Sequence, residues 1–270
     1  MPQLDTTAES SAKHILVYGP PKSGKSLLVG KLAEHFNLIW FDLESGHDVL
    51  YQLPKEHQKR IQLIPIPDTS DYPIAIETCL KVIRGGPGWV CSEHGKVDCP
   101  RCIDRSNKND IKPKEGNIAD FVELSKTPLD TVVVFDSLTQ LTNSGIANIS
   151  KDHGDNYKLN YDDWAKLGRL MDTFLGFVQV APCHVVCISH ESMVETEDKK
   201  EKIVPVAGTR NFSRNSAKYF GEVIYCEVKN KKHQFGSGTT YKMDTLTGSR
   251  HGLKLEDGDS LSNLFITKSK

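Results

Sequence analysis

The chain contains 270 residues, of which 38% are hydrophobic and 26% are charged. This composition supplies enough apolar side chains for a buried core and excludes a disordered chain. The 34 basic and 35 acidic residues leave a formal net charge of −1, so nucleic-acid binding would have to come from local basic loops. No run approaches the length of a transmembrane helix, and we expect no membrane partner. Residues 1–12 lack the apolar centre of a signal peptide, and we expect them to form an unstructured lead of a cytoplasmic protein.

Short apolar runs alternate with helical patterns along most of the chain. Strands are predicted at residues 14–18, 38–41, 61–66, 131–135 and 183–189. Helices are predicted at residues 26–36, 74–83 and 162–180. We expect the charged segment 191–210 to be mobile, and residues 223–228 and 240–243 to form a terminal strand pair. The alternation predicts an α/β fold over residues 13–270, with a mainly parallel central sheet that binds its ligands at the carboxyl ends of the strands.

A phosphate-binding pattern follows the first predicted strand. Residues 19–26 match G-x-x-x-x-G-K-[ST], with a strand before them and a helix after them; the alternative is an accidental Gly-rich turn. The two glycines allow backbone N–H groups to point at phosphate oxygens, Lys25 reaches the β- and γ-phosphates, and Ser26 offers a hydroxyl to Mg²⁺. Lys22 is either a further phosphate contact or a solvated lysine. The predicted nucleotide-binding residues are Gly19, Pro20, Pro21, Lys22, Ser23, Gly24, Lys25, Ser26 and Leu27.

Polar side chains follow three of the predicted strands. Asp136 ends an apolar strand, where an ionised carboxylate is costly unless a cation such as Mg²⁺ compensates it; capping of the next helix or turn is the alternative. Glu44 could deprotonate a water beside the γ-phosphate, and Asp42 or Glu44 could instead bind a ribose or be a solvated loop acid. His190 could contact the γ-phosphate or the same water, or serve only the structure.

Four residues with metal-ligand chemistry lie close together in a polar segment over residues 89–126. Cys91-x-x-His94 and Cys99-x-x-Cys102 supply three thiolates and one imidazole, the donor set of a closed, structural zinc site. Free surface thiols or redox cysteines are the alternatives. We interpret residues 89–126 as a zinc-binding insertion in the core. Its basic side chains could dock a partner or DNA, and a plain stabilised loop is an equal alternative.

The order of these motifs resembles the RecA-type P-loop ATPase core. GPPKSGKS is followed by FDLES, VVVFDSLTQL, a long helix and VVCISH. The resemblance implies that Glu44 activates water, that Asp136 supports Mg²⁺, and that His190, where the family usually has Gln, senses the nucleotide. It also implies that residues 142–161 and 192–211 are loops that bind single-stranded DNA.

Residues 228–232 resemble a RecA stretch whose lysines reach the ATP of a neighbouring subunit. The resemblance implies that Lys229 and Lys231 stabilise charge on the phosphoryl group across a homo-oligomer interface. Arg210 and Arg214 are alternative cations, and ordinary solvated or DNA-facing charge is the alternative for all four residues.

More narrowly, the chain resembles compact phage-encoded RecA-like nucleotide-binding proteins, some of which act in single-strand annealing and recombination. This resemblance implies an ATPase that uses ATP, Mg²⁺ and Zn²⁺ in the cytoplasm of a host cell, with single-stranded DNA and a single-strand-binding protein as partners. Two other functions stay open. One is an ATP-driven motor or switch that acts on a protein partner, such as a helicase loader, and the other is a small-molecule kinase whose lid is the segment 191–210.

Overall fold

The computed structural model describes residues 12–107, 110–154, 156–195, 199–236, 244–250 and 260–265. Residues 1–11 of the expected lead and residues 240–243 of the expected strand pair lie outside this part of the chain. Within the described residues, none of the helices combines the length and hydropathy needed to cross a lipid bilayer.

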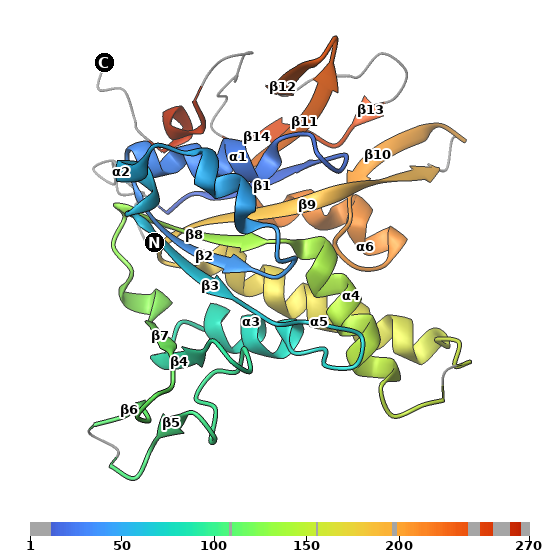
Figure 1. Cartoon of the computed structure of the whole chain (residues 1–270). Helices are drawn as coiled ribbons and strands as arrows, with labels where there is room; N and C mark the ends of the chain where they lie inside the picture. The colour runs from blue at the N-terminus through green and yellow to red at the C-terminus, as the bar shows by residue number, and fades with distance from the viewer. Residues whose placement is uncertain are drawn as a thin grey trace, which may run out of the picture.

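A central, mainly parallel sheet runs through the molecule (Figure 1). Its order is β12 (Lys232–Gly236), β11 (Glu222–Lys229), β1 (His14–Gly19), β9 (His184–Glu195), β8 (Thr131–Asp136), β2 (Asn37–Asp42) and β3 (Ile61–Pro65). Every neighbouring pair from β11 to β3 is parallel, whereas β12 joins β11 as an antiparallel hairpin. The strands predicted from buried apolar runs are therefore confirmed, and so is the parallel sheet.

Alternating side chains of the strands divide the core into two layers. On β1, Leu16 and Tyr18 belong to a cluster with α3 (Ala75–Ile83), α4 (Leu138–Ser150) and α5 (Tyr161–Val180). Ile15 and Val17 belong to the other cluster, with α1 (Lys25–Gly30) and the 3₁₀ segments η1 (Lys31–Glu34), η2 (His47–Gln52) and η5 (Leu261–Leu264). The short α2 (Lys55–Gln58) follows η2. Figure 1 shows these helical layers on opposite sides of the sheet.

The helices differ from the prediction in two places. The helix expected over residues 26–36 is split, because α1 ends at Gly30 and continues as η1. The helix α4 was not predicted, and it occupies the first part of the expected DNA-binding loop 142–161. Only the residues between Ser150 and Tyr161 connect α4 to α5. The prediction of α5 is confirmed, and Asn160 and Asp163 fix its start with a capping box.

The segment expected to be mobile contains an antiparallel ribbon instead. β9 continues beyond the sheet to Glu195 and pairs with β10 (Glu201–Pro205). Val194 and Val204 are buried, so the ribbon has one packed face among its charged residues. The expectation of mobility is therefore wrong for these two strands. β13 (Asp244–Thr245) lies beside β10, β14 (Gly248–Ser249) lies beside β11, and α6 (Arg210–Asn215) with η4 (Ser216–Tyr219) leads from the ribbon back to β11.

The chain leaves the sheet between α3 and β8. There β4 (Gly88–Cys91) pairs with β7 (Ala119–Val122), and β5 (Ile103–Asp104) pairs with β6 (Lys112–Pro113), before η3 (Leu124–Lys126) leads back to β8. Figure 1 shows both pairs below the main sheet. Their small core consists of buried Cys91, Cys99, Cys102 and Ile103.

Candidate active site and metal centre

The site residues predicted from sequence meet at the carboxyl edge of the parallel strands. Gly19 at the end of β1 lies opposite His190 of β9, and Asp136 at the end of β8 lies opposite Asp42 of β2. Glu44 follows β2 directly. One edge of the sheet therefore carries the phosphate-binding pattern, both aspartates, Glu44 and His190, as the rule for ligand sites in parallel sheets requires.

Both glycines of the phosphate-binding pattern are needed for the close approach of neighbouring strands. A Cβ at Gly19 would collide with the backbone carbonyl of Cys226 on β11. Gly24, directly before α1, has a left-handed φ of 86°, and a Cβ there would lie 2.9 Å from Nδ1 of His233 on β12. The loop is thus shaped by its own conformation and by the β11–β12 hairpin beside it. Lys22 is exposed on this loop.

Lys25 lies at the first position of α1 and is 6% exposed. Its Nζ donates hydrogen bonds to the carbonyl oxygens of Gly19 at 3.1 Å and Pro20 at 2.8 Å. Burial lowers the pKa of Lys25, and the nearby charges of Asp136 and Glu44 act in the opposite direction. The ammonium is therefore held beside the place where the pattern predicts phosphates.

Ser26 and Asp136 are in direct contact although they lie far apart in the sequence. Ser26 Oγ donates a hydrogen bond to Oδ2 of Asp136 at 2.8 Å. Burial raises the pKa of Asp136 to about 7, the carboxylates of Glu44 and Asp42 add to the rise, and Ser26 opposes it. A bound cation would relieve this cost of ionisation, so the pair fits Mg²⁺. Helix capping by Asp136 is not observed, because Ser137 caps α4 by accepting from the N–H of Gln140.

The carboxylate of Glu44 is held by two side chains. Ser137 Oγ donates to Oε1, and His190 Nε2 lies 3.3 Å from Oε2. Burial raises the pKa of Glu44, but the contacts with His190 and Ser137 and the charge of Lys25 outweigh it, so the pKa lies below its usual value. Glu44 is therefore ionised at neutral pH, the form that can accept a proton from water. Its side chain is 28% exposed, which leaves room for water to reach it.

Asp42 shapes the loop that carries Glu44. Its Oδ1 accepts hydrogen bonds from the backbone N–H groups of Glu44 at 3.3 Å and Gly46 at 3.1 Å, and its Oδ2 lies 2.5 Å from Nδ1 of His47. Asp42 is 1% exposed. Because both oxygens are engaged inside the loop, the arrangement argues against ribose binding by Asp42.

Three further residues of the site were missed by the sequence analysis. Ser137 binds Glu44, Thr139 Oγ1 accepts from the backbone N–H of His190 at 2.9 Å, and His233 Nδ1 lies 2.9 Å from the carbonyl oxygen of Ser23. The position of Ser137 between an apolar strand and a helix is a capping signal that could have singled it out. No signal was available for His233, since its strand β12 was not predicted.

The four candidate cross-subunit cations lie on two other segments. Lys229 is the last residue of β11, and Lys231 lies in the turn to β12, where Asn230 and Lys231 have the left-handed φ values of 52° and 62°. Arg210 begins α6, and Arg214 of the same helix donates to the carbonyl oxygen of Glu195 in the ribbon. The catalytic role of these cations stays a prediction.

The four predicted zinc ligands lie close together in the insertion between α3 and β8. The donor atoms of Cys91, His94, Cys99 and Cys102 all lie within 4.8 Å of one another. His94 Nδ1 is 3.3 Å from Cys102 Sγ and 3.8 Å from Cys99 Sγ. Three sulfurs and one imidazole nitrogen at this spacing fit a single tetrahedral Zn²⁺. Zinc binding itself stays a prediction.

Hydrogen bonds tie this cluster to the main core. Thr78 Oγ1 on α3 donates to the carbonyl oxygen of Gly95 at 2.5 Å, and Tyr72 donates through its hydroxyl to the carbonyl oxygen of His94 at 3.0 Å. The expectation of a basic surface here is wrong, because residues 89–126 contain seven basic and seven acidic side chains. Lys112, for example, pairs with Asp110 at 2.6 Å. Charge therefore gives the insertion no preference for DNA.

Comparison with known proteins links the chain to one family. A sequence model of the family described as AAA domain matches residues 11–255. A search of curated proteins finds no match. Among solved structures, the flagellar accessory protein FlaH from Methanocaldococcus jannaschii is 15% identical, with a TM-score of 0.38 over 87% of this chain and 80% of that chain. An ATPase from the type III secretion system of pathogenic bacteria is 11% identical, with a TM-score of 0.42 over 80% of this chain and 52% of that chain.

Proposed function

The chain belongs to the AAA domain family and is an ATPase of the P-loop type, and from this premise we propose that it hydrolyses Mg²⁺–ATP with Glu44 as the general base. The observation that carries the proposal is the 2.8 Å contact between Ser26 and Asp136, which lies at the same sheet edge as Lys25 and the ionised Glu44. A phosphate loop, a cation-binding pair and a base are the parts that phosphoryl transfer to water needs.

Each residue has a defined task in this proposal. The backbone N–H groups of residues 19–26 and the start of α1 hold the phosphates, and Lys25 turns from the loop carbonyls to the β- and γ-phosphates. Ser26 and Asp136 would hold Mg²⁺, which would neutralise charge on the phosphate oxygens. Glu44 orients the attacking water and accepts its proton. Ser137 and His190 hold the carboxylate of Glu44 in place.

We also propose that single-stranded DNA binds next to this site and stimulates turnover. Aromatic side chains gather at the α4–α5 connection, where Tyr161 is 86% exposed, Trp164 is 41% exposed, and the rings of His153 and Tyr157 stack with centroids 3.8 Å apart. Exposed aromatic rings are platforms for stacking of unpaired bases. β9 runs from His190 directly into the ribbon, so a ligand on the ribbon would act on the same strand that contacts Glu44.

In this proposal the protein acts in recombination, annealing or repair as a homo-oligomer, with Lys229 and Lys231 completing the site of a neighbouring copy. The same resemblance leads us to propose a phage-encoded origin and a single-strand-binding protein as a partner. The Cys/His cluster would hold Zn²⁺ as a structural staple of residues 89–126, because all four ligand positions are filled by the protein.

A competing function is a switch that acts on a protein partner. The charge around the α4–α5 connection favours it, since Asp152 and Asp162 are exposed and Asp163 is half-buried beside the aromatic side chains, and all three would repel a phosphate backbone. The aromatic surface would then contact a protein instead of bases. The two functions differ in whether DNA changes the rate of hydrolysis.

The test is ATP turnover measured with and without a single-stranded oligonucleotide, together with the mass of the assembly and binding at several salt concentrations. DNA stimulation that weakens with salt and is lost in Tyr161→Ala would support the DNA proposal. Turnover without any DNA binding at low salt would reject it and favour the protein partner. Lys25→Ala serves as the hydrolysis-deficient control.

A further inference from the structure

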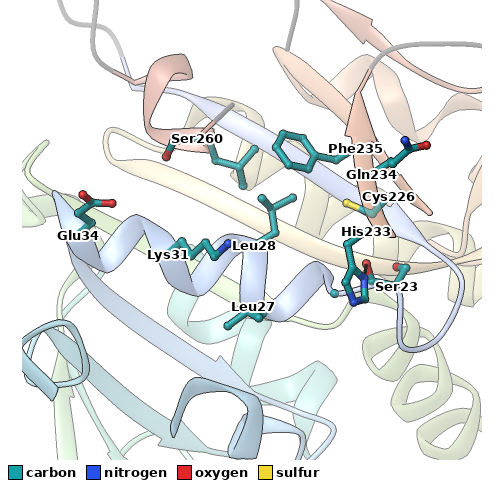
Figure 2. A pocket seen from close by; sticks show the side chains of 12 residues that line it. Ser23, Leu27, Leu28, Lys31, Glu34, Cys226, His233, Gln234, Phe235 and Ser260 are labelled. Atoms are coloured by element: carbon teal, nitrogen blue, oxygen red, sulfur yellow. Dashed lines mark hydrogen bonds between the residues drawn. The ribbon is translucent and has the colours of Figure 1, made fainter. Parts of the chain in front are cut away.

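A pocket of about 320 Å³ lies beside the phosphate loop, on the side of α1 that faces β12 and η5. It begins at Ser23 and Gly24 and follows α1 and η1 as far as Glu34. Figure 2 shows its walls, with Leu28 and Lys31 on one side and Phe235 and Gln234 of β12 on the other. The carboxylates of Asp42, Glu44 and Asp136 do not line this pocket, so it is separate from the proposed place of hydrolysis.

The chemistry of the walls differs between the centre of the pocket and its rim. Leu28 and Phe235 lie on opposite walls and both pack against the same core cluster, which holds them in place. Leu27, Leu261 and Cys226 add further apolar surface. The polar side chains of the lining are Ser23, Lys31, Glu34, His233, Gln234 and Ser260. An apolar slot with polar groups at its edges suits a flat, partly polar ring.

We propose that this pocket receives the base and ribose of the nucleotide whose phosphates lie on residues 19–26, with the base stacked on Phe235. This rests on the proposed function. The pocket is continuous with the phosphate loop, because Ser23 and Gly24 belong to both. Its volume lies at the lower end of the roughly 300–1,000 Å³ range of small-molecule sites, which suits a nucleoside and excludes a polymer.

The hydrogen bond between His233 and Ser23 explains how base and phosphates would be kept in register. His233 Nδ1 lies 2.9 Å from the carbonyl oxygen of Ser23, and His233 is two residues from Phe235 on the same short strand. The wall that carries the aromatic ring is therefore fastened to the loop that carries the phosphates. Stacking depends on ring area, so purine nucleotides bind more tightly than pyrimidine nucleotides.

The experiment is calorimetric titration of the full chain with ATP, GTP, CTP and inorganic tripolyphosphate in the presence of Mg²⁺. We expect Phe235→Ala to weaken ATP affinity by roughly 5- to 150-fold, the change that about 1–3 kcal/mol of base stacking produces. Its affinity for tripolyphosphate stays unchanged, because the phosphate loop is intact. Phe121→Ala, which removes an exposed ring from β7, is the matched control and leaves both affinities unchanged.

Two further variants test the proposed position of the base if Phe235→Ala folds poorly. Phe235→Leu keeps apolar volume in the wall, and it is expected to lose the preference for purines while unfolding at the temperature of the parent. Tyr51→Ala removes an exposed ring of η2, outside the pocket lining, and is expected to retain ATP affinity. Equal loss of ATP and tripolyphosphate in Phe235→Leu, or loss of ATP affinity in Tyr51→Ala alone, would overturn the proposed base position.

The failure of this inference differs from the failure of the proposed function. If the parent protein binds neither ATP nor tripolyphosphate, nucleotide binding at residues 19–26 is wrong. If the parent binds both, Lys25→Ala loses both, and the Phe235 variants behave like the parent, only the base position is wrong.

Discussion

The nucleotide site and the Cys/His cluster of this molecule are built in opposite ways. The nucleotide site joins residues at the ends of β1, β2, β8 and β9. Its key pair, Ser26 and Asp136, is separated by 110 residues in the sequence. The Cys/His cluster draws its four donors from residues 91–102, which run from the last residue of β4 to the residue before β5 and have a small core of their own. The first site exists only when the sheet is folded, whereas a bound metal would hold the four donors of the second together locally.

This difference predicts which part of the molecule each site stabilises. The carboxylates at the sheet edge lie on a core that apolar side chains already stabilise, so the fold does not depend on them. Within residues 89–126, Val90, Val122 and Leu124 belong to the main core, whereas Cys91, Cys99, Cys102 and Ile103 form a small cluster of their own. Metal ligation would therefore supply much of the stability of the part around the four donors. Variants that disable one site at a time separate these two dependences.

Glu44→Gln should remove hydrolysis and leave everything else in place. The amide cannot accept the proton of the attacking water, and we expect turnover to fall roughly 10²- to 10⁴-fold while ATP affinity and metal content stay unchanged. Phosphate release measures turnover, and calorimetry measures ATP affinity. Glu77→Gln, an exposed glutamate that pairs with Lys81 on α3, is the control. Unaltered turnover in Glu44→Gln would remove Glu44 from its assigned role.

Cys99→Ser should damage the cluster and spare the sheet. We expect zinc to be lost and residues 89–126 to become sensitive to protease, with the main unfolding transition nearly unchanged. Cys79→Ser gives the reciprocal result, because a hydroxyl at this fully buried position of α3 destabilises the core by about 1–3 kcal/mol while zinc is retained. Metal analysis, limited proteolysis and thermal unfolding distinguish the two. A parent protein without zinc would disprove the metal site.

Asp136→Asn should change how stability depends on pH. The pKa of Asp136 is raised from the usual 3.8 to about 7. The folded protein therefore keeps a proton that the unfolded chain has lost, and this group makes stability fall as pH rises from about 4 to 7, by up to about 1.4 kcal/mol per pH unit. Asn lacks this contribution. The measurement is denaturant unfolding at pH 5 and pH 7 without nucleotide or Mg²⁺. The unfolding free energy of the variant relative to that of the parent should be higher at pH 7 than at pH 5. An equal change with pH in both proteins would contradict the prediction.

His47→Ala should have the smallest effect. The variant loses one of the hydrogen bonds on Asp42, but two backbone N–H groups still hold that carboxylate. We expect kcat to fall roughly 2- to 10-fold through looser positioning of Glu44, with ATP affinity unchanged. His57→Ala in the short α2 is the matched control. An equal loss of kcat in this variant would show that His47 does not act through the positioning of Glu44.

The parts of the structure that could be predicted are those with local signals. The phosphate loop and the cluster of Cys91, His94, Cys99 and Cys102 are visible as spacings, and each buried strand is visible as an apolar run. The convergence of Glu44, Asp136 and His190 on one edge followed from a parallel topology. The β9–β10 ribbon was missed because its few buried residues, such as Val194, are surrounded by charge.

Other features depend on contacts that no local pattern encodes. Ser137 acquires its bond to Glu44 only when β8 lies beside β2, and His233 reaches Ser23 only through the β11–β12 hairpin. The pairing of residues 191–195 with residues 201–205 likewise depends on contacts between two strands. Long-range register, not residue type, determines these contacts.

The two hydrogen bonds from Lys25 to the carbonyl oxygens of Gly19 and Pro20 would affect how a nucleotide is exchanged at the proposed site. A triphosphate bound by Lys25 would displace these carbonyl oxygens, which would accept the hydrogen bonds of the ammonium again when the nucleotide leaves. Release would then leave no buried cation without a partner, and this would lower the barrier to emptying the site. The main chain of the loop would thus compete with the nucleotide for Lys25 and keep its binding reversible.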